Sequence, residues 1–297
     1  MDIIKIKKTP IIPDYSYDIT DYEYPKCIVD FIDRMKNRNL SKFYYNLEDL
    51  ELKVGTEKEF VNKNAGAEYD LFTNIILYKK DRLEENIMHE LIHVSTRLEL
   101  RDRILVGFLQ LFDSGYGIGE GLNEGYTALQ DDRYFLDYAP DKAFQQNNIY
   151  PTLKYICNIL EYLVTKDQME DYFYDANLYG LFKELSQYSS YRKTYNFLMN
   201  TDYLFKLTDK QALNNIKAIM ITYPRVFYYL SECFLTRFKI MREKGELSNE
   251  DYNNNIQFVK WLLNNEIIVS RYRSPKLGIY FNDLDKIAND NLKSRVK

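Results

Sequence analysis

Histidine and cysteine are both scarce in this chain of 297 residues, which has two histidines and three cysteines. Cys27, Cys157 and Cys233 lie far apart, their number is odd, and the sequence contains no C-x-x-C pair. This usage argues against a disulfide framework and against a cysteine-based zinc site. We therefore expect three buried free thiols, because an unpaired cysteine behaves as a small hydrophobic residue.

Long apolar runs and an excess of basic charge are missing as well. No run approaches the roughly 18 apolar residues of a membrane span, and the start of the chain lacks the apolar segment of a secretory signal. The 40 basic and 44 acidic residues give a net charge of −4, which argues against nucleic-acid binding. We expect no transmembrane segment and, by default, a cytoplasmic protein, with export that needs no signal peptide as the alternative.

The two histidines are placed together, with His89 and His93 four residues apart and Glu90 directly after the first. Two histidines placed at random would form this H-E-x-x-H pattern roughly once in 2000 arrangements. Residues four apart lie one above the other on a helix, so both imidazoles can reach one metal ion. Glu90 can take a proton from a water whose pKa zinc has lowered. The pattern is typical of the zinc site of a metallopeptidase.

The third ligand has to be a different kind of residue. Catalytic zinc usually has three protein ligands, and because no histidine is left, the third must be a carboxylate or a cysteine. The best candidate is Glu124, at the start of a predicted helix. Six of the eleven glycines lie between residues 107 and 125. They predict a loop with unusual backbone angles that lets the second helix fold back against the first.

Two short segments carry a family resemblance. His-Glu-Leu-Ile-His at 89–93 and Leu-Asn-Glu-Gly-Tyr at 122–126 resemble the gluzincin class of zinc metallopeptidases, which includes thermolysin-like enzymes and the M1 aminopeptidases. The resemblance implies that His89, His93 and Glu124 bind one catalytic Zn²⁺, that Glu90 is the general base, and that the substrate is a peptide or protein. The chain is also similar to small uncharacterised zincin-like proteins of Firmicutes and their phages. The specific resemblance covers about residues 65–135.

The sequence departs from this class in two places. The Gly-x-Met-x-Asn motif of the M1 exopeptidases is absent, so we expect an endopeptidase rather than an aminopeptidase. The aspartate that thermolysin-like enzymes carry four residues after the third ligand is Ala128 here. Support for a ligand histidine must then come from another residue. Asp131, further along the same helix face, and Asp102 are the candidates.

Several residues in the sequence could stabilise the oxyanion that forms during peptide hydrolysis. The pentapeptide at 89–93 also matches the clostridial neurotoxin light chains, and residues 192–195 match their Arg-x-x-Tyr oxyanion pair. Without a third histidine, a tyrosine or arginine must take this role if anything does. The candidates are Tyr126, Arg133, Tyr134 and Tyr195.

The residues at 75–78 occupy the place of the strand that commonly pairs with extended substrate in zincins. Pairing of this kind would be addition of the substrate as a further strand of the sheet. A plain structural edge strand is the alternative.

The remaining patterns predict the other elements. The early part should contain an extended arm over 1–25, a helix over 25–40, strands at 50–54, 68–70 and 75–78, and helices at 81–98 and 122–135. A helix should begin at Pro151. The later helices should run from a capping box at Thr208 to Tyr223, where Pro224 ends it, from Arg225 to a stop at Gly245, and from Ser248 past Trp261.

Together these patterns predict an α+β fold, predominantly α, with a zincin-like metallopeptidase core, a small N-terminal β-sheet and a helical C-terminal part. The catalytic domain should span 1–205, with its active-site core at 65–135, and a helical subdomain should span 206–297. The expected function is a zinc-dependent peptidase. The alternative is a non-catalytic zincin-like interaction or regulatory protein. Glu90 favours the enzyme, because a structural zinc site needs no general base.

Overall fold

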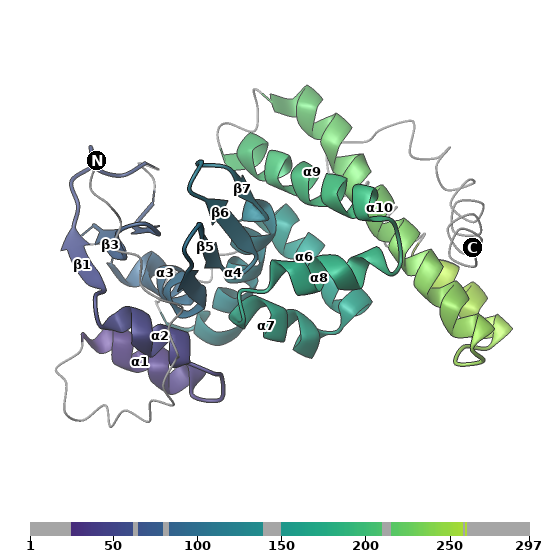
Figure 1. Ribbon diagram of the computed structural model, residues 1–297, viewed down its shortest axis with the longest axis horizontal. Helices are drawn as coiled ribbons and strands as arrows, with labels where there is room; N and C mark the ends of the chain where they lie inside the picture. The colour runs from purple at the N-terminus through teal and green to yellow at the C-terminus, as the bar shows by residue number, and fades with distance from the viewer. Residues whose placement is uncertain are drawn as a thin grey trace. The chain divides into compact units, whose positions relative to one another are not determined.

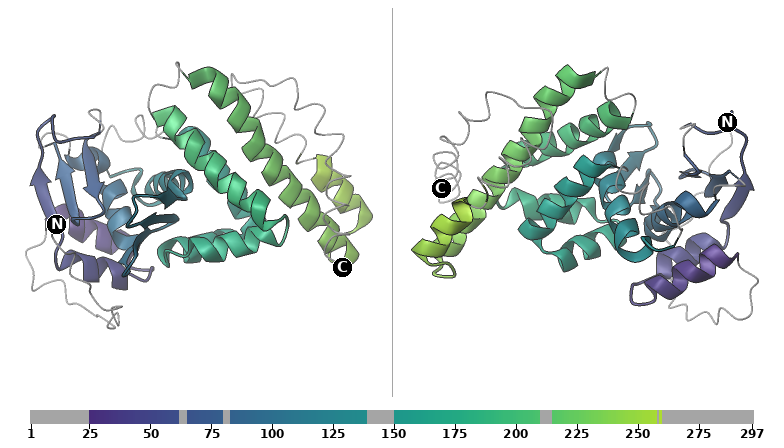
Figure 2. Two further views of the ribbon diagram at one scale, coloured as in Figure 1. Left: turned by 45° about the horizontal axis from the view of Figure 1, so that its top comes forward. Right: turned by 180° about the vertical axis from the view of Figure 1, so that it is seen from behind.

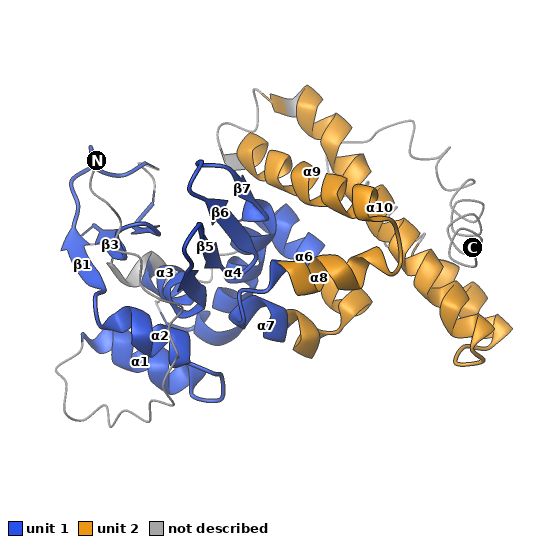
Figure 3. Cartoon of the chain, in the orientation of Figure 1, with its two compact units in different colours: residues 1–157, 170–178 blue, residues 158–169, 179–297 orange. Residues whose placement is uncertain are grey.

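The chain divides into two compact units. The computed structural model describes residues 25–61, 65–79, 83–138, 150–209, 215–257 and 259 (Figure 1). Unit 1 comprises residues 1–157 and 170–178, and unit 2 comprises residues 158–169 and 179–297 (Figure 3). The division therefore differs from the predicted boundary at residue 205, which falls inside helix α9 (Tyr191–Asp209). This helix is continuous and packs along α10 (Ile216–Glu243) within unit 2, so both helices stay in one unit.

The described elements confirm an α+β fold that is predominantly helical. The helices in unit 1 or shared between the units are α1 (Lys26–Met35), α2 (Ser41–Leu47), α3 (Leu83–Thr96), α4 (Glu120–Phe135), α6 (Pro151–Val164), α7 (Lys166–Tyr174) and α8 (Leu178–Ser186). The strands are β1 (Glu51–Val54), β2 (Ala67–Asp70), β3 (Ile75–Tyr78), β4 (Arg97–Glu99), β5 (Arg103–Val106), β6 (Leu109–Phe112) and β7 (Gly117–Ile118). The predicted helix over 25–40 corresponds to α1, which ends at Met35, and the following helix α2 was not predicted.

The first sheet has the strand order β1-β3-β2. β3 runs parallel to β1 and antiparallel to β2, to which a turn at 71–74 connects it. The expectation that β3 lies at an edge is wrong, because its backbone pairs with a strand on each side. The strand with an outer edge next to α3 is β2, which packs against that helix.

The glycine-rich segment is mostly a sheet rather than the predicted loop. β4, β5, β6 and β7 form an antiparallel sheet in that order. Gly107 and Phe108 make the two-residue turn between β5 and β6, where Gly107 has φ +52°. Gly119 has φ +88° and precedes the first residue of α4. The segment does connect α3 with α4, as predicted, but it does so through paired strands. Gly107 lies in a turn between two of these strands, and Gly119 lies directly before α4.

Helix α3 lies in the interior of unit 1. Every side chain from Ile87 to Arg97 is buried, so the histidine face of the helix is covered as well as its apolar face. α1 and α2 lie against α3 (Figures 1 and 2). The side-chain amide of Asn46 in α2 donates to the carbonyls of Val94 and Arg97. These bonds satisfy carbonyl groups that the end of α3 would otherwise leave without a partner.

Two predictions about the later helices are wrong. Thr208 does not open a helix, since it lies in α9, where its hydroxyl donates to the carbonyl of Leu204. Pro224 does not end one, because α10 continues through it to Glu243. Buried neighbours on both sides, Tyr223 and Val226 among them, hold this helix together despite the backbone bond that proline removes.

Other predicted helix ends agree with the structure. α6 begins at Pro151, and α10 is followed by Gly245 with φ +74°. The Ser248 hydroxyl accepts a hydrogen bond from the backbone of Asp251 at the start of the helix over 249–257. Trp261 and the arm before residue 25 lie outside the described residues. In the described part of the chain, no helix has the length and apolar character needed to cross a membrane.

Candidate metal centre

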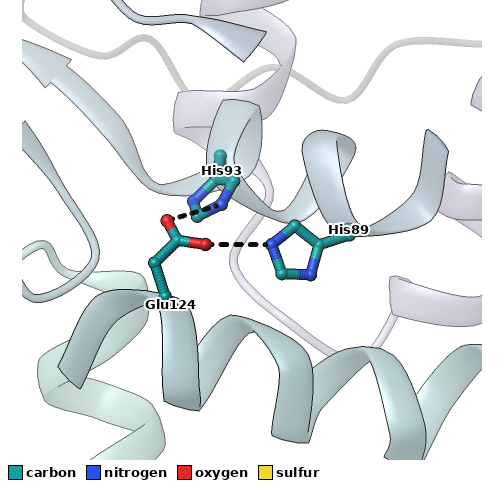
Figure 4. Close-up of side chains that lie close together, drawn as sticks. All are labelled: His89, His93 and Glu124. Carbon is teal, nitrogen blue, oxygen red and sulfur yellow. Dashed lines mark hydrogen bonds and ion pairs between the residues drawn. The ribbon is translucent and has the colours of Figure 1, made fainter. Parts of the chain in front are cut away.

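The structure brings His89, His93 and Glu124 together. The two histidines come from consecutive turns of α3, and Glu124 reaches toward both rings from the first turns of α4 (Figure 4). One nitrogen of each ring and one carboxylate oxygen all lie within 4.8 Å of one another. The histidines expose only 8% and 5% of their surface, so the cluster is enclosed by the protein.

Two distances in the cluster have the size expected between the ligands of one zinc ion, while the ligand atoms as a set lie within 4.8 Å of one another. Nε2 of His89 lies 3.4 Å from Oε2 of Glu124, and Nε2 of His93 lies 3.4 Å from Oε1. Strong charge-assisted hydrogen bonds are shorter, at about 2.7–2.9 Å. Two ligand atoms that each lie about 2.1 Å from a tetrahedral zinc ion are separated by roughly 3.4 Å. Two imidazoles and a carboxylate are also the donor set of several catalytic zinc sites.

In the absence of a metal, the cluster holds a proton. Burial opposes protonation of His89, but its hydrogen bond to Glu124 and the charges of Glu90 and Glu124 raise its pKa to about 9. Burial and the neighbouring His89 lower the pKa of His93 to about 4. The pKa of Glu124 lies below its ordinary value, because the imidazoles outweigh the effect of burial. A metal cation bound here would compete with protonation of the imidazoles.

Glu90 lies next to the cluster, against the outer edge of β2. Its Oε2 accepts a hydrogen bond of 3.1 Å from the backbone N–H of Tyr69. Burial raises the pKa of Glu90 to about 8, although the charge of His89 and the Tyr69 N–H act in the opposite direction. A carboxyl group whose pKa lies this close to neutrality can exchange protons with a substrate or water.

Asn123 and Thr127 contact the second ring nitrogen of His93, a role for which sequence reasoning did not consider them. The Asn123 amide nitrogen lies 3.3 Å from Nδ1, and the Thr127 hydroxyl lies 3.5 Å from it. Both residues flank Glu124 on α4, and both are buried. Their spacing of four residues was the available signal, since it places both on the helix face that carries Glu124 toward α3.

The two aspartates proposed to support a ligand histidine lie in different surroundings. Asp131 is buried on α4, and its charge contributes to the raised pKa of His89. Asp102 lies in the turn between β4 and β5, where its largely exposed side chain pairs with Arg103 at 3.1 Å. The position of Asp131 therefore agrees with a supporting role for that residue, whereas Asp102 is engaged elsewhere.

The oxyanion candidates of unit 1 contact other side chains of that unit. Tyr126 is fully buried in an aromatic cluster with Phe108 and Phe173. Arg133 lies 3.7 Å from the buried carboxylate of Glu170. Tyr134 accepts a hydrogen bond from Arg38, which also pairs with Glu170.

The remaining pair, Arg192 and Tyr195, is exposed on α9 in unit 2. Comparison with protein-family models, with curated proteins and with solved structures finds no match to this chain.

Proposed function

We propose that this protein is a zinc-dependent endopeptidase with a zincin-like core. The observation that carries the proposal is the convergence of His89, His93 and Glu124, with Glu90 on the helix that supplies both histidines. A buried zinc site with a purely structural role has no need of a carboxyl group beside its ligands. Here that carboxyl group is present, and its pKa of about 8 is set by burial.

In peptide hydrolysis, the candidate ligands and Glu90 would have different roles. His89, His93 and Glu124 would hold a zinc ion, which would supply the Lewis-acid chemistry that lowers the pKa of water and polarises a peptide carbonyl. Glu90 accepts the proton of the attacking water and passes it to the leaving amine, as a general base and then a general acid. The N–H of Tyr69 holds the Glu90 side chain in place during both transfers.

The outer edge of β2 is the surface on which an extended peptide would lie. The carbonyl of Gly66 accepts a bond from Lys79, so residues 66, 68 and 70 face β3 in the antiparallel ladder. The backbone groups of Ala67 and Tyr69 consequently point to the opposite edge, where Glu90 lies. A peptide that adds to this edge as a strand would pass beside Glu90 and would pair with the outward-pointing groups other than the Tyr69 N–H, which donates to Glu90.

The experiment is cleavage of a peptide library by the wild-type chain and by the Glu90→Gln variant, each loaded with zinc. Glu90→Gln should retain zinc and lose roughly 10²–10⁴-fold in turnover, since it keeps an acceptor for Tyr69 but has no base. Glu51→Gln, on the exposed strand β1, is the matched control and should cleave normally. Equal cleavage by Glu90→Gln would remove its role. A wild-type chain that binds zinc but cleaves nothing would indicate the non-catalytic alternative.

The same library tests the position of the substrate. If peptides bind as an added strand, linear peptides should be cleaved, and the same sequences closed into small rings by a disulfide should not be. Equal cleavage of both forms would contradict binding at the β2 edge without affecting the role of Glu90.

A further inference from the structure

The hydrogen bonds around His93 determine which of its ring nitrogens carries a proton. Nε2 faces the carboxylate of Glu124 at 3.4 Å. Nδ1 faces the Asn123 side-chain amide at 3.3 Å and the Thr127 hydroxyl at 3.5 Å. A histidine that binds a metal through Nε2 must carry its proton on Nδ1, and this N–H needs an acceptor.

A second hydrogen bond, on the side of Asn123 away from His93, sets the orientation of its side-chain amide. Its Oδ1 accepts a hydrogen bond of 3.1 Å from the backbone N–H of Phe108, in the turn between β5 and β6. A backbone N–H can only donate, so the atom of Asn123 that faces it must be the oxygen. The amide nitrogen is thereby left facing His93.

In the metal-free site this orientation disfavours a proton on Nδ1 of His93. The amide nitrogen of Asn123 can only donate, so it favours the tautomer in which Nδ1 accepts and the ring proton lies on Nε2. On Nε2 the proton points at the Glu124 carboxylate. The metal-free site therefore favours the tautomer that cannot bind a metal through Nε2.

We propose that Thr127 is the positioning residue that accepts the Nδ1–H of His93 when a metal is bound, and that Asn123 favours the opposite tautomer in the metal-free site. A hydroxyl group suits this exchange, because it can donate or accept, whereas the oriented amide cannot. At 3.5 Å the Thr127 contact is long for a hydrogen bond. A ring shift of a few tenths of an ångström would bring it to the usual range of about 2.7–3.2 Å. The proposal rests on the zinc site proposed above and is independent of peptidase activity.

The tautomer can be measured directly, since His89 and His93 are the only imidazoles in the chain. Two-bond ¹H–¹⁵N spectra of the ¹⁵N-labelled full chain report on this site alone, and His89→Ala assigns the two rings. Without metal, Nδ1 of His93 should be unprotonated. With one equivalent of zinc it should carry a proton. Finding Nδ1 protonated in both states would overturn the role given to Asn123.

Zinc affinity tests Thr127. Thr127→Val keeps the shape of the side chain but removes the hydroxyl, and should weaken zinc binding by about tenfold, the low end of the range for such supporting partners. Thr127→Ser restores a hydroxyl and should bind zinc within about twofold of wild type, by the same measure. Wild-type affinity in Thr127→Val, or failure of Thr127→Ser to recover it, would overturn the assignment.

A double-mutant cycle with Asn123→Asp separates hydrogen bonding from general loss of packing. The introduced carboxylate can accept from Phe108 with one oxygen and from Nδ1 of His93 with the other. In that background Thr127→Val should cost less than about twofold in zinc affinity, against tenfold in wild type. An equal loss in both backgrounds would mean that Thr127 acts through packing. If the wild-type chain binds no zinc, both proposals fail, whereas zinc binding unaffected by Thr127→Val refutes only the role of Thr127.

Discussion

At the scale of single residues, the scarcity of histidine makes the site unusually simple to test. His89 and His93 are the only imidazoles, and Glu124 is the one residue that joins them in the metal-binding cluster found among the described residues. No other histidine can substitute for a lost ligand. A change in zinc affinity after substitution of one of the three therefore reports on that ligand directly.

Replacing Glu124 with alanine should weaken zinc binding by more than about 100-fold, because loss of even a supporting partner costs 10–100-fold. Isothermal titration of the metal-free chain with zinc measures the change. Glu120→Ala, one turn earlier on α4 and outside the cluster, is the matched control and should bind zinc as wild type does. Unchanged affinity in Glu124→Ala would show that another residue is the third ligand.

At the scale of elements, the turn between β5 and β6 orients a residue of the metal centre. Its Phe108 N–H sets the Asn123 amide, and Gly107 lets the turn come this close. A Cβ atom on Gly107 would collide with Oδ1 of Asn123 and with the ring of Phe173. Gly107 also has a positive φ, which a residue with a side chain adopts at a cost.

Two glycine substitutions separate these effects. Gly115 has φ +80°, and a Cβ atom added there would meet open space. Gly115→Ala should therefore lower the free energy of unfolding only by the backbone strain, about 1–2 kcal/mol. Gly107→Ala should cost about 1–3 kcal/mol more, because the added methyl group overpacks the turn. Denaturant unfolding measures the difference, and zinc titration should show weaker binding only for Gly107→Ala. Equal stability and equal affinity of the two variants would contradict the proposed contact.

At the scale of the whole molecule, the candidate metal centre lies inside the core of unit 1. α3 is buried along its length from Ile87, and α1, α2, β2 and α4 pack against it. Because an unfolded chain does not hold the three candidate ligands together, zinc binding at this site would add its free energy to the stability of the folded state.

Zinc should therefore stabilise the protein against heat. At a free zinc concentration of about 100 times Kd, the expected gain is about 2.7 kcal/mol, which corresponds to an increase in Tm of roughly 5–10 °C. A chelator should reverse the increase. Calorimetry of His89→Ala provides the control, in which zinc should leave Tm unchanged. A wild-type Tm that does not respond to zinc would contradict the site.

Local sequence patterns predicted much of the fold and the cluster of candidate ligands. The periodicity around 83–98 and 122–135 indicated α3 and α4, and the strands at 51–54, 67–70 and 75–78 follow the alternation in the sequence. Pro224 and Thr208 misled the prediction, because local propensity is weaker than the packing of a long helix against its neighbours. The glycine-rich segment also misled the prediction. Strands that are joined by glycine turns have the same glycine content as a loop, so composition alone does not distinguish the two.

The sequence by itself determined which side chains could meet at a metal. Two histidines four residues apart must share a helix face, because the α-helix has 3.6 residues per turn. Only the tertiary structure decided what surrounds them. The central position of β3, the bond from Tyr69 to Glu90 and the contacts of Asn123 and Thr127 with Nδ1 of His93 all join segments far apart in the chain. Such contacts depend on how the helices and strands pack, which local spacing does not encode.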